Sequence, residues 1–260
     1  MPGRLPQKTI VIAGAAGGQG SAGALLFAAE GANLALCDIN AVGLAETADL
    51  VKAQFPDVTA LTETVDMRSV ADIRRFAERV MATFDAVDVV YNNAGVNHLG
   101  SIEDATEDEW DRVHDVNLKS AFFLVKYLLP GLKKSQGASI INVSSGAGLL
   151  APADGNSMYC SSKGGLISLT RAQARDLAPH NIRVNCLLPG PIETAMVRGF
   201  FDAMAPEERV AGEATVLGRS LFKRFGQPAE VAAVAVFLAL PESSYMTASI
   251  IPVDAGWTAV

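Results

Sequence analysis

The sequence predicts an α/β protein built on a doubly wound, seven-stranded parallel sheet with helices on both faces. Short β-branched apolar runs alternate with longer helical stretches along the whole chain. In addition, 50% of the residues are hydrophobic and only 19% are charged, which suits strands buried on both faces. No internal repeat or linker divides the 260 residues, so we expect a single domain over residues 1–260.

Seven apolar runs are predicted to form the strands. In chain order they lie near residues 8–13, 33–38, 59–65, 87–92, 139–144, 183–188 and 250–254. Parallel strands need right-handed crossovers, so the helices between them should cover the sheet. Pro252 lacks an N–H donor, which places the last strand at a sheet edge.

One helix has clear boundary signals. The run Thr106-Glu107-Asp108-Glu109 is a capping box that should begin the helix carrying Asn117. Pro130 followed by Gly131 should end that helix, because proline cannot continue the hydrogen-bond ladder.

The segment 195–225 does not alternate cleanly between apolar and polar residues. It is either a mobile substrate lid or a helical excursion packed on the body of the protein. We favour the lid, because the segment follows the sixth strand at the edge where such sheets bind ligands.

A glycine-rich turn follows the first strand. Gly14, Gly18 and Gly20 have G-x-x-x-G-x-G spacing and precede a small-residue helix over residues 21–29. Glycines here permit a tight strand-to-helix turn and let the backbone approach a pyrophosphate at the helix N-terminus. The alternative is a turn without a ligand, but the flanking strand and helix favour a Rossmann fold that binds a dinucleotide.

Asp38 ends the second predicted strand, about 20 residues after the glycine motif. A carboxylate there accepts the adenosine ribose hydroxyls and repels a 2′-phosphate, and no Lys or Arg occurs from residue 13 to residue 40. The alternative is a solvated aspartate at a strand end. The sequence therefore predicts NAD as the cofactor in preference to NADP.

Three further residues indicate acid/base chemistry. Ser145 closes the fifth strand, at the edge where open α/β sheets bind ligands. Tyr159 and Lys163 share a helix face, so the lysine charge should lower the phenol pKa from its usual value of about 10. A Tyr–Lys pair alone is usually a surface coincidence, and a serine at this place can merely end a strand. Together with the upstream motifs, they predict proton exchange with an alcohol or carbonyl.

These motifs resemble those of the short-chain dehydrogenase/reductase family over nearly the whole chain. The resemblance also rests on Asp66, Asn92–Gly95, Val116–Lys119, Pro189–Thr194, Arg224–Ala232 and Val253–Gly256. The chain departs from the usual pattern at Ala13, Gln19 and Ala255. The Gln19 side chain could touch the phosphates or the nicotinamide end of a cofactor.

We predict reversible hydride transfer between NAD and a secondary alcohol or ketone. In oxidation, Tyr159 as phenolate takes the hydroxyl proton, and Ser145 donates a hydrogen bond to the substrate oxygen. The resemblance implies that Lys163 also binds the nicotinamide ribose and that Asn117 organises a water leading protons to solvent.

The resemblance also implies which residues bind the cofactor. Thr194 and the backbone of Ile192 would hold the carboxamide, and Asp66 and the Asn93–Gly95 turn would hold the adenosine. The full expected set is Gly14, Gly18, Gln19, Gly20, Asp38, Asp66, Met67, Asn93, Ala94, Gly95, Tyr159, Lys163, Pro189, Gly190, Ile192 and Thr194.

Composition argues against several other classes. The net charge of -7 and the absence of basic clusters argue against a nucleic-acid partner. The longest apolar stretches, such as residues 231–240, are too short to span a bilayer. Residues 1–7 lack an apolar signal core, so a cytoplasmic protein is expected. The three cysteines and three histidines show no metal-ligand spacing, so no metal site is expected.

Two alternatives remain. One is a non-catalytic NAD-binding sensor or scaffold, although such a protein should lack part of the catalytic set. The other is a 3-oxoacyl-carrier reductase, which Asp38 and the acidic balance oppose. The apolar segment 195–225, with Asn97, His98, Met158 and Trp257, suggests a hydrophobic or cyclic alcohol as substrate.

The resemblance further implies a homotetramer. Its contacts would be the long helices around Asn117 and residues 158–177, with the last helix and strand. An apolar tail over residues 257–260, next to an edge strand, would otherwise expose hydrophobic surface.

Overall fold

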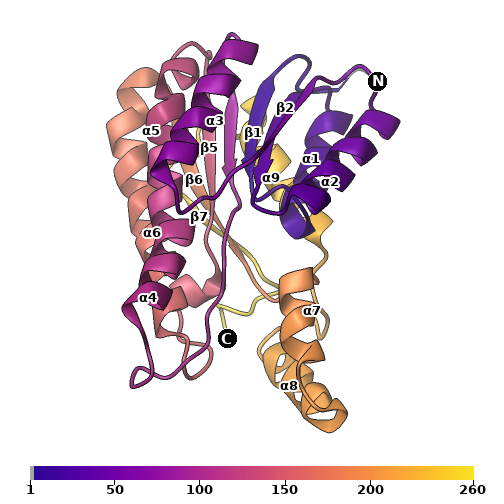
Figure 1. The fold of residues 1–260 in the computed structure, drawn as a ribbon, viewed down its shortest axis with the longest axis vertical. Coiled ribbons are helices and arrows are strands. Elements are labelled where there is room, and N and C mark those ends of the chain that lie inside the picture. Colours follow the sequence, from indigo (N-terminus) through magenta and orange to yellow (C-terminus); the bar gives the residue numbers. More distant parts are fainter. Residues whose placement is uncertain (1–2) are drawn as a thin grey trace.

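The computed structural model describes residues 3–260 and contains a seven-stranded parallel sheet covered by helices on both faces (Figure 1). Its strand order is β3-β2-β1-β4-β5-β6-β7, which confirms the predicted fold class. The strands are β1 (Thr9–Ala13), β2 (Asn33–Asp38), β3 (Ala60–Thr64), β4 (Val89–Asn92), β5 (Ser139–Val143), β6 (Arg183–Pro189) and β7 (Ile250–Val253).

Two helical layers enclose two hydrophobic cores. Along β1, Ile10 and Ile12 pack into one core and Val11 and Ala13 into the other. Successive strand residues point to opposite faces, so an unbroken apolar run is what a strand buried on both sides requires. One layer holds α1 (Gly18–Ala29), α2 (Ala41–Gln54) and α9 (Pro228–Ala239), and the other holds α3 (Val70–Thr83), α5 (Ser120–Leu132) and α6 (Ser157–Leu177) (Figure 1).

The helix that carries Asn117 is divided into three parts. The capping box at Thr106 begins α4 (Glu107–His114) as predicted, and a π-helical turn, Asp115–Lys119, joins α4 to α5. The prediction that Pro130 and Gly131 end the helix was slightly wrong, because α5 continues to Leu132. Proline here removes one hydrogen bond within the last turn, and that turn is still closed by Lys133 N–H donating to the Leu129 carbonyl.

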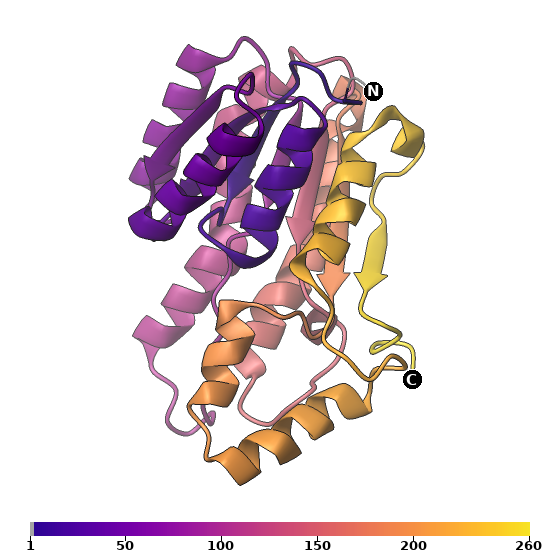
Figure 2. The same cartoon turned by 90° about the vertical axis from the view of Figure 1, so that its right-hand side faces the viewer.

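The segment 195–225 forms two helices, α7 (Ala195–Asp202) and α8 (Pro206–Gly218), which project beyond the carboxyl ends of the strands (Figure 2). Both ends of the segment are joined at one point: Ile192 forms a β-bridge with Gly226, and Glu193 N–H donates to the Gly226 carbonyl at 2.8 Å. The helices therefore leave and rejoin the body at one place. That they move as a lid remains a prediction.

The C-terminal region differs from the expected exposed tail. β7 is an edge strand that pairs only with β6, as Pro252 predicted. Trp257, however, is 7% exposed and packs within its own chain: a Cβ on Gly146 would lie 2.7 Å from its indole ring. Of the two large hydrophobic side chains in this tail, only Val260 is exposed, at 70%. Over residues 3–260, none of the helices combines the length and the apolar character needed to cross a membrane.

Candidate active site

A cavity of about 710 Å³ opens at the carboxyl ends of the strands, beside β1 and β4. This is where strand order reverses and where open α/β sheets bind their ligands. All but two of the predicted catalytic and cofactor-binding residues line it; the exceptions are Gly20 and Asn117. The lining ones are Gly14, Gly18, Gln19, Asp38, Asp66, Met67, Asn93, Ala94, Gly95, Ser145, Tyr159, Lys163, Pro189, Gly190, Ile192 and Thr194.

The glycine-rich turn forms the floor of the cavity. Gly20 lies inside the turn, where an added Cβ would stand 1.9 Å from the Gly14 carbonyl oxygen. Gly14 has a φ of 78° and Gly18 a φ of 53°, values that side chains rarely permit. The Asn93 side-chain amide donates to the Gly14 carbonyl at 2.9 Å and braces the turn. The result is a fixed backbone surface that fits a pyrophosphate.

Gln19 gives a second sign that the cavity fits a polar ligand. Its amide oxygen is buried and has no hydrogen-bond partner among the described residues. A buried acceptor without a partner is costly. A ligand with N–H or O–H donors would satisfy it, and a nicotinamide dinucleotide carries both.

Asp38 is fixed in position by the backbone. Its Oδ2 accepts from Ala16 N–H and its Oδ1 from Asn40 N–H, both at 2.9 Å. Each carboxylate oxygen has two lone pairs, so both oxygens can still accept a ribose hydroxyl. The carboxylate is thus oriented toward the cavity before any ligand arrives.

Tyr159 and Ser145 lie together on one side of the cavity. Tyr159 belongs to the first turn of α6, and Ser145 follows β5. Burial raises the pKa of the Tyr159 phenol above its usual value, while the Ser145 hydroxyl opposes that shift. Ala147 N–H donates to Ser145 Oγ at 3.1 Å, which orients the hydroxyl.

Lys163 is buried one helical turn further along α6. Its ammonium donates to the Val143 carbonyl at 2.9 Å and lies 5.7 Å from the centroid of the Tyr159 ring. Burial lowers its pKa from 10.5 to about 8. The expected lowering of the Tyr159 pKa by Lys163 stays a prediction, because burial and the Ser145 hydroxyl have the largest effects on this pKa in the structure.

Asn117 lies behind the cavity, in the π-helical turn. Its Oδ1 accepts from Val96 N–H at 2.8 Å, and its Nδ2 donates to the Val96 carbonyl at 2.9 Å and to Ser162 Oγ at 3.0 Å. The side chain therefore holds the loop after β4 against α6. A Cβ on Gly95 would stand 3.2 Å from Lys163 Nζ and 3.4 Å from Asn117 Oδ1, so a larger residue there would require these side chains to move by a few tenths of an ångström.

Comparison with known proteins identifies the family. A family model described as enoyl-(acyl carrier protein) reductase matches residues 14–258. The chain is 39% identical to the 3-oxoacyl-[acyl-carrier-protein] reductase of Thermotoga maritima, over 97% of this chain and 98% of that protein. This chain belongs to the short-chain dehydrogenase/reductase family. It is therefore an oxidoreductase acting on CH–OH groups, and its family implies a nicotinamide nucleotide as cofactor.

Two other members of the family bear on the substrate. The chain is 35% identical to the cyclopentanol dehydrogenase of a Comamonas strain, with 99% of each protein covered. It also superimposes on the crystal structure of levodione reductase with a TM-score of 0.91 at 30% identity, covering 99% of this chain and 100% of that one.

The structure brings two arginines to this short-chain dehydrogenase/reductase site that the sequence motifs did not indicate. Arg68, after β3, and Arg112, on α4, both line the cavity. Arg68 Nη2 lies 2.6 Å from Asp66 Oδ2, and the guanidinium holds the pKa of that carboxyl below its usual range. The only available signal was that Arg68 stands two residues after Asp66.

The side chains suggested as substrate contacts lie elsewhere. Asn97, His98, Met158 and Trp257 are absent from the cavity lining. His98 turns toward Glu109, with 3.8 Å between Nε2 and Oε1, and Met158 is buried in the core side of α6. The apolar side chains of Val96, Met196 and Val197 line the cavity instead. No sequence motif predicted this group.

Proposed function

We propose that this enzyme interconverts a secondary alcohol and a ketone, with NAD as the hydride carrier. The observation that carries the proposal is the shared cavity. Tyr159, Ser145 and Lys163 line it opposite a glycine-rich turn whose backbone fits a pyrophosphate.

The bound nicotinamide would accept or supply the hydride. Tyr159 would take the proton from the alcohol oxygen during oxidation and return it during reduction. Ser145 would donate a hydrogen bond to the same oxygen, holding it beside the phenol. Because burial raises the Tyr159 pKa, formation of phenolate at neutral pH needs nearby positive charge. Lys163 is the buried cation on the same helix.

Three features support NAD in preference to NADP. Asp38 is oriented by two backbone N–H groups, and a carboxylate at this place repels a 2′-phosphate. No Lys or Arg follows it closely along the chain. Arg68 lines the cavity, but its guanidinium is held by Asp66 through hydrogen bonds from both Nε and Nη2.

We further propose a hydrophobic or cyclic alcohol as substrate. Support comes from the apolar side chains Val96, Met196 and Val197 on the open side of the cavity, and from the similarity to a cyclopentanol dehydrogenase.

A second candidate is reduction of a carrier-bound 3-oxoacyl group, because a 39% identical relative bears that name. Asp38 and the net charge of -7 argue against it, since the usual reductant would be NADPH and the carrier is acidic.

One assay separates the candidates. Purified enzyme is mixed with a panel of linear and cyclic secondary alcohols, with NAD or NADP, and NADH formation is followed by absorbance. A parallel arm supplies a 3-oxoacyl thioester with NADPH or NADH. The proposal expects turnover of alcohols with NAD. Turnover confined to the thioester with NADPH would establish the second candidate. NADH binding without turnover of any substrate would favour a sensor or scaffold.

We also propose a homotetramer that acts in the cytoplasm. The two exposed aromatic side chains Trp110 and Phe122, at 46% and 47% exposure, lie on the α4–α5 helices that would pair. Light scattering of the purified protein tests the assembly, and a stable monomer at micromolar concentration contradicts it.

A further inference from the structure

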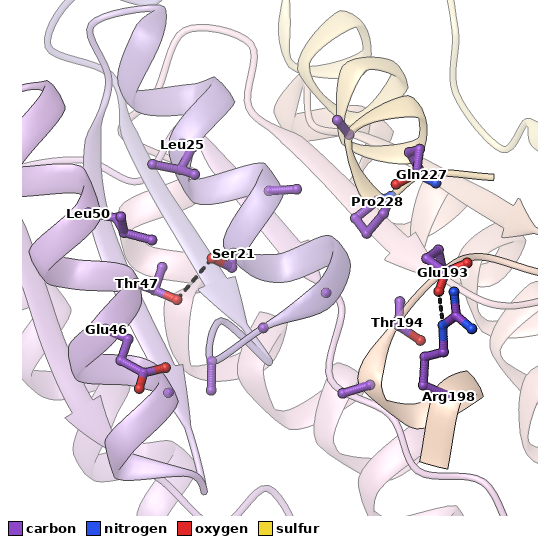
Figure 3. A pocket seen from close by; sticks show the side chains of 17 residues that line it. Ser21, Leu25, Glu46, Thr47, Leu50, Glu193, Thr194, Arg198, Gln227 and Pro228 are labelled. Atoms are coloured by element: carbon purple, nitrogen blue, oxygen red, sulfur yellow. Dashed lines mark hydrogen bonds and ion pairs between the residues drawn. The ribbon is translucent and has the colours of Figure 1, made fainter. Parts of the chain in front are cut away.

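A second cavity of about 630 Å³ lies on the outer side of the glycine-rich turn (Figure 3). Helices α1 and α2 form one wall, and the starts of α7 and α9 form the other. It shares five lining residues with the cofactor cavity: Ala16, Gly17, Gly18, Thr194 and Ala195. A pyrophosphate held by the turn would therefore be open to this side as well.

Arg198 is the only Lys or Arg among the residues that line this second cavity. It lies on α7 one helical turn after Thr194, and its backbone N–H donates to the Thr194 carbonyl at 2.8 Å. Thr194 itself contacts the turn, since a Cβ on Gly18 would stand 3.1 Å from Thr194 Cγ2. The guanidinium is thus carried by the piece of α7 closest to the phosphate-binding backbone.

Arg198 pairs with Glu193, and the two side chains face each other at the rim of the cavity (Figure 3). The Arg198 side chain is 47% exposed and the Glu193 side chain is 26% exposed. Ion pairs with this exposure are screened by solvent and contribute little. Arg198 can therefore exchange this partner for a better one at small cost.

The charge balance around the turn calls for such a cation. A pyrophosphate brings two negative charges, yet the chain from residue 13 to residue 40 contains no Lys or Arg. The second cavity adds the carboxylates of Glu46 and Glu193. A planar guanidinium can bind two oxygens of a carboxylate or of a phosphate, and a pyrophosphate offers it two negative charges where Glu193 offers one.

We propose that Arg198 leaves Glu193 and binds the pyrophosphate of the bound dinucleotide. The inference rests on the proposed NAD site and adds a cofactor-binding residue to it. It also gives the cofactor a hold on α7, whose Met196 and Val197 line the substrate side of the first cavity. Cofactor binding would thereby set the wall against which the substrate packs.

Direct binding measurements with four variants test the exchange. The probes are NADH, followed by its fluorescence, and ADP-ribose and adenosine as competitors that do and do not carry a pyrophosphate. Arg198→Ala should weaken NADH and ADP-ribose by about tenfold and leave adenosine unchanged. Glu193→Gln removes the same ion pair but frees the guanidinium, so NADH should bind as tightly as in wild type or a few-fold more tightly.

Arg209→Ala is the matched control. Arg209 pairs with Asp202 and Glu213 on α7 and α8 and lines neither cavity, so its loss should not change NADH affinity. Arg198→Lys keeps the charge without the planar fork and should recover part of the affinity. Hydrogen exchange over residues 195–218 should slow on NADH binding in wild type and in Arg209→Ala, but not in Arg198→Ala.

Each result that contradicts the proposal has its own interpretation. Equal weakening by Arg198→Ala and Glu193→Gln would make the ion pair a structural brace and overturn the exchange. Unchanged ADP-ribose affinity in Arg198→Ala would overturn it too, while leaving the NAD site intact. Failure of the wild-type protein to bind NADH or ADP-ribose would overturn the proposed function together with this inference.

Discussion

Helices α6 and α7 border the same cavity. α6 is fixed to the sheet, whereas α7 and the helix α8 that follows it project beyond the sheet (Figure 2). α6 buries Lys163 and Thr170 and is bonded to β5: Ser144 Oγ donates to the Lys163 carbonyl at 2.8 Å, and Asn142 donates to Thr170 at 3.0 Å. In α8 no described residue is fully buried. Both α7 and α8 carry exposed ion pairs, including those of Arg198 and Arg209.

The difference assigns separate tasks to the two regions. Acid/base groups must be held to a fraction of an ångström, and the buried side of α6 provides that. Segments with few buried contacts open at low free-energy cost, which suits a wall that admits and releases substrate. Substitutions on α6 should therefore change turnover, and substitutions of the α7 residues that line the cavity should change binding.

The largest effect is expected for Tyr159→Phe. The variant keeps the ring but removes the acid/base group, so turnover should fall by at least about a hundredfold while NADH still binds. Steady-state rates and NADH fluorescence titration check both parts. Near-normal turnover would show that Tyr159 takes no part in the chemistry. It would also contradict the assignment of turnover to α6.

Lys163→Met tests the cost of a buried cation. Burial lowers the Lys163 pKa from 10.5 to about 8, so between these pH values the folded protein binds fewer protons than the unfolded chain. Lys163 alone should therefore raise the free energy of unfolding by on the order of 3 kcal/mol as pH increases from about 8 to 10.5. The buried thiols of Cys37 and Cys186, whose pKa values burial raises, act in the opposite direction in both proteins. Below pH 8 the full cost of the buried charge is present.

The methionine variant should lack this pH dependence and should be more stable than wild type at pH 7. It should also lose turnover and NADH affinity, because the ammonium is gone. Urea unfolding of the cofactor-free proteins at about pH 7 and about pH 10 measures the difference. Parallel pH profiles for the two proteins would show that Lys163 is not the group responsible.

Cofactor choice should change by a smaller factor. The enzyme should prefer NAD to NADP by at least about tenfold, or roughly 1.4 kcal/mol. Exchanging Asp38 for Ala and Ile39 for Arg should shift preference toward NADP, and kcat/KM for both cofactors measures the shift. Because Asp38 also accepts from Ala16 N–H, Asp38→Asn serves as a control that keeps an acceptor. Equal use of both cofactors by the wild type would remove the role given to Asp38.

The features that the sequence predicted depend on neighbouring residues, and most of those that it missed depend on residues far apart in the chain. The strands and the glycine-rich turn follow from contiguous residues, because burial on both faces requires an unbroken apolar run such as Thr9–Ala13. The sequence did not predict that α5 continues beyond Pro130 to Leu132. No sequence motif marks the residues whose hydrogen bonds close this last turn.

Long-range placement explains the other differences. Trp257 was expected to be exposed because its partner, Gly146, lies more than a hundred residues away in the chain. Arg68, Arg112 and Arg198 reach the two cavities from three separate segments. No local pattern encodes such convergence, whereas Tyr159 and Lys163 were found because both lie on one helix.

The smallest effect is expected on the wall opposite α6. Met196 lines the cavity and is 50% exposed, so Met196→Ala should remove apolar contact with substrate without disturbing Tyr159. KM for the alcohol should rise a few-fold, consistent with about 1 kcal/mol of lost burial, while kcat stays within about twofold. Val210→Ala on α8 is the control, because Val210 is 70% exposed and lines neither cavity. A large fall in kcat at unchanged KM would place Met196 with the rigid catalytic groups and dissolve the division of tasks between α6 and α7–α8.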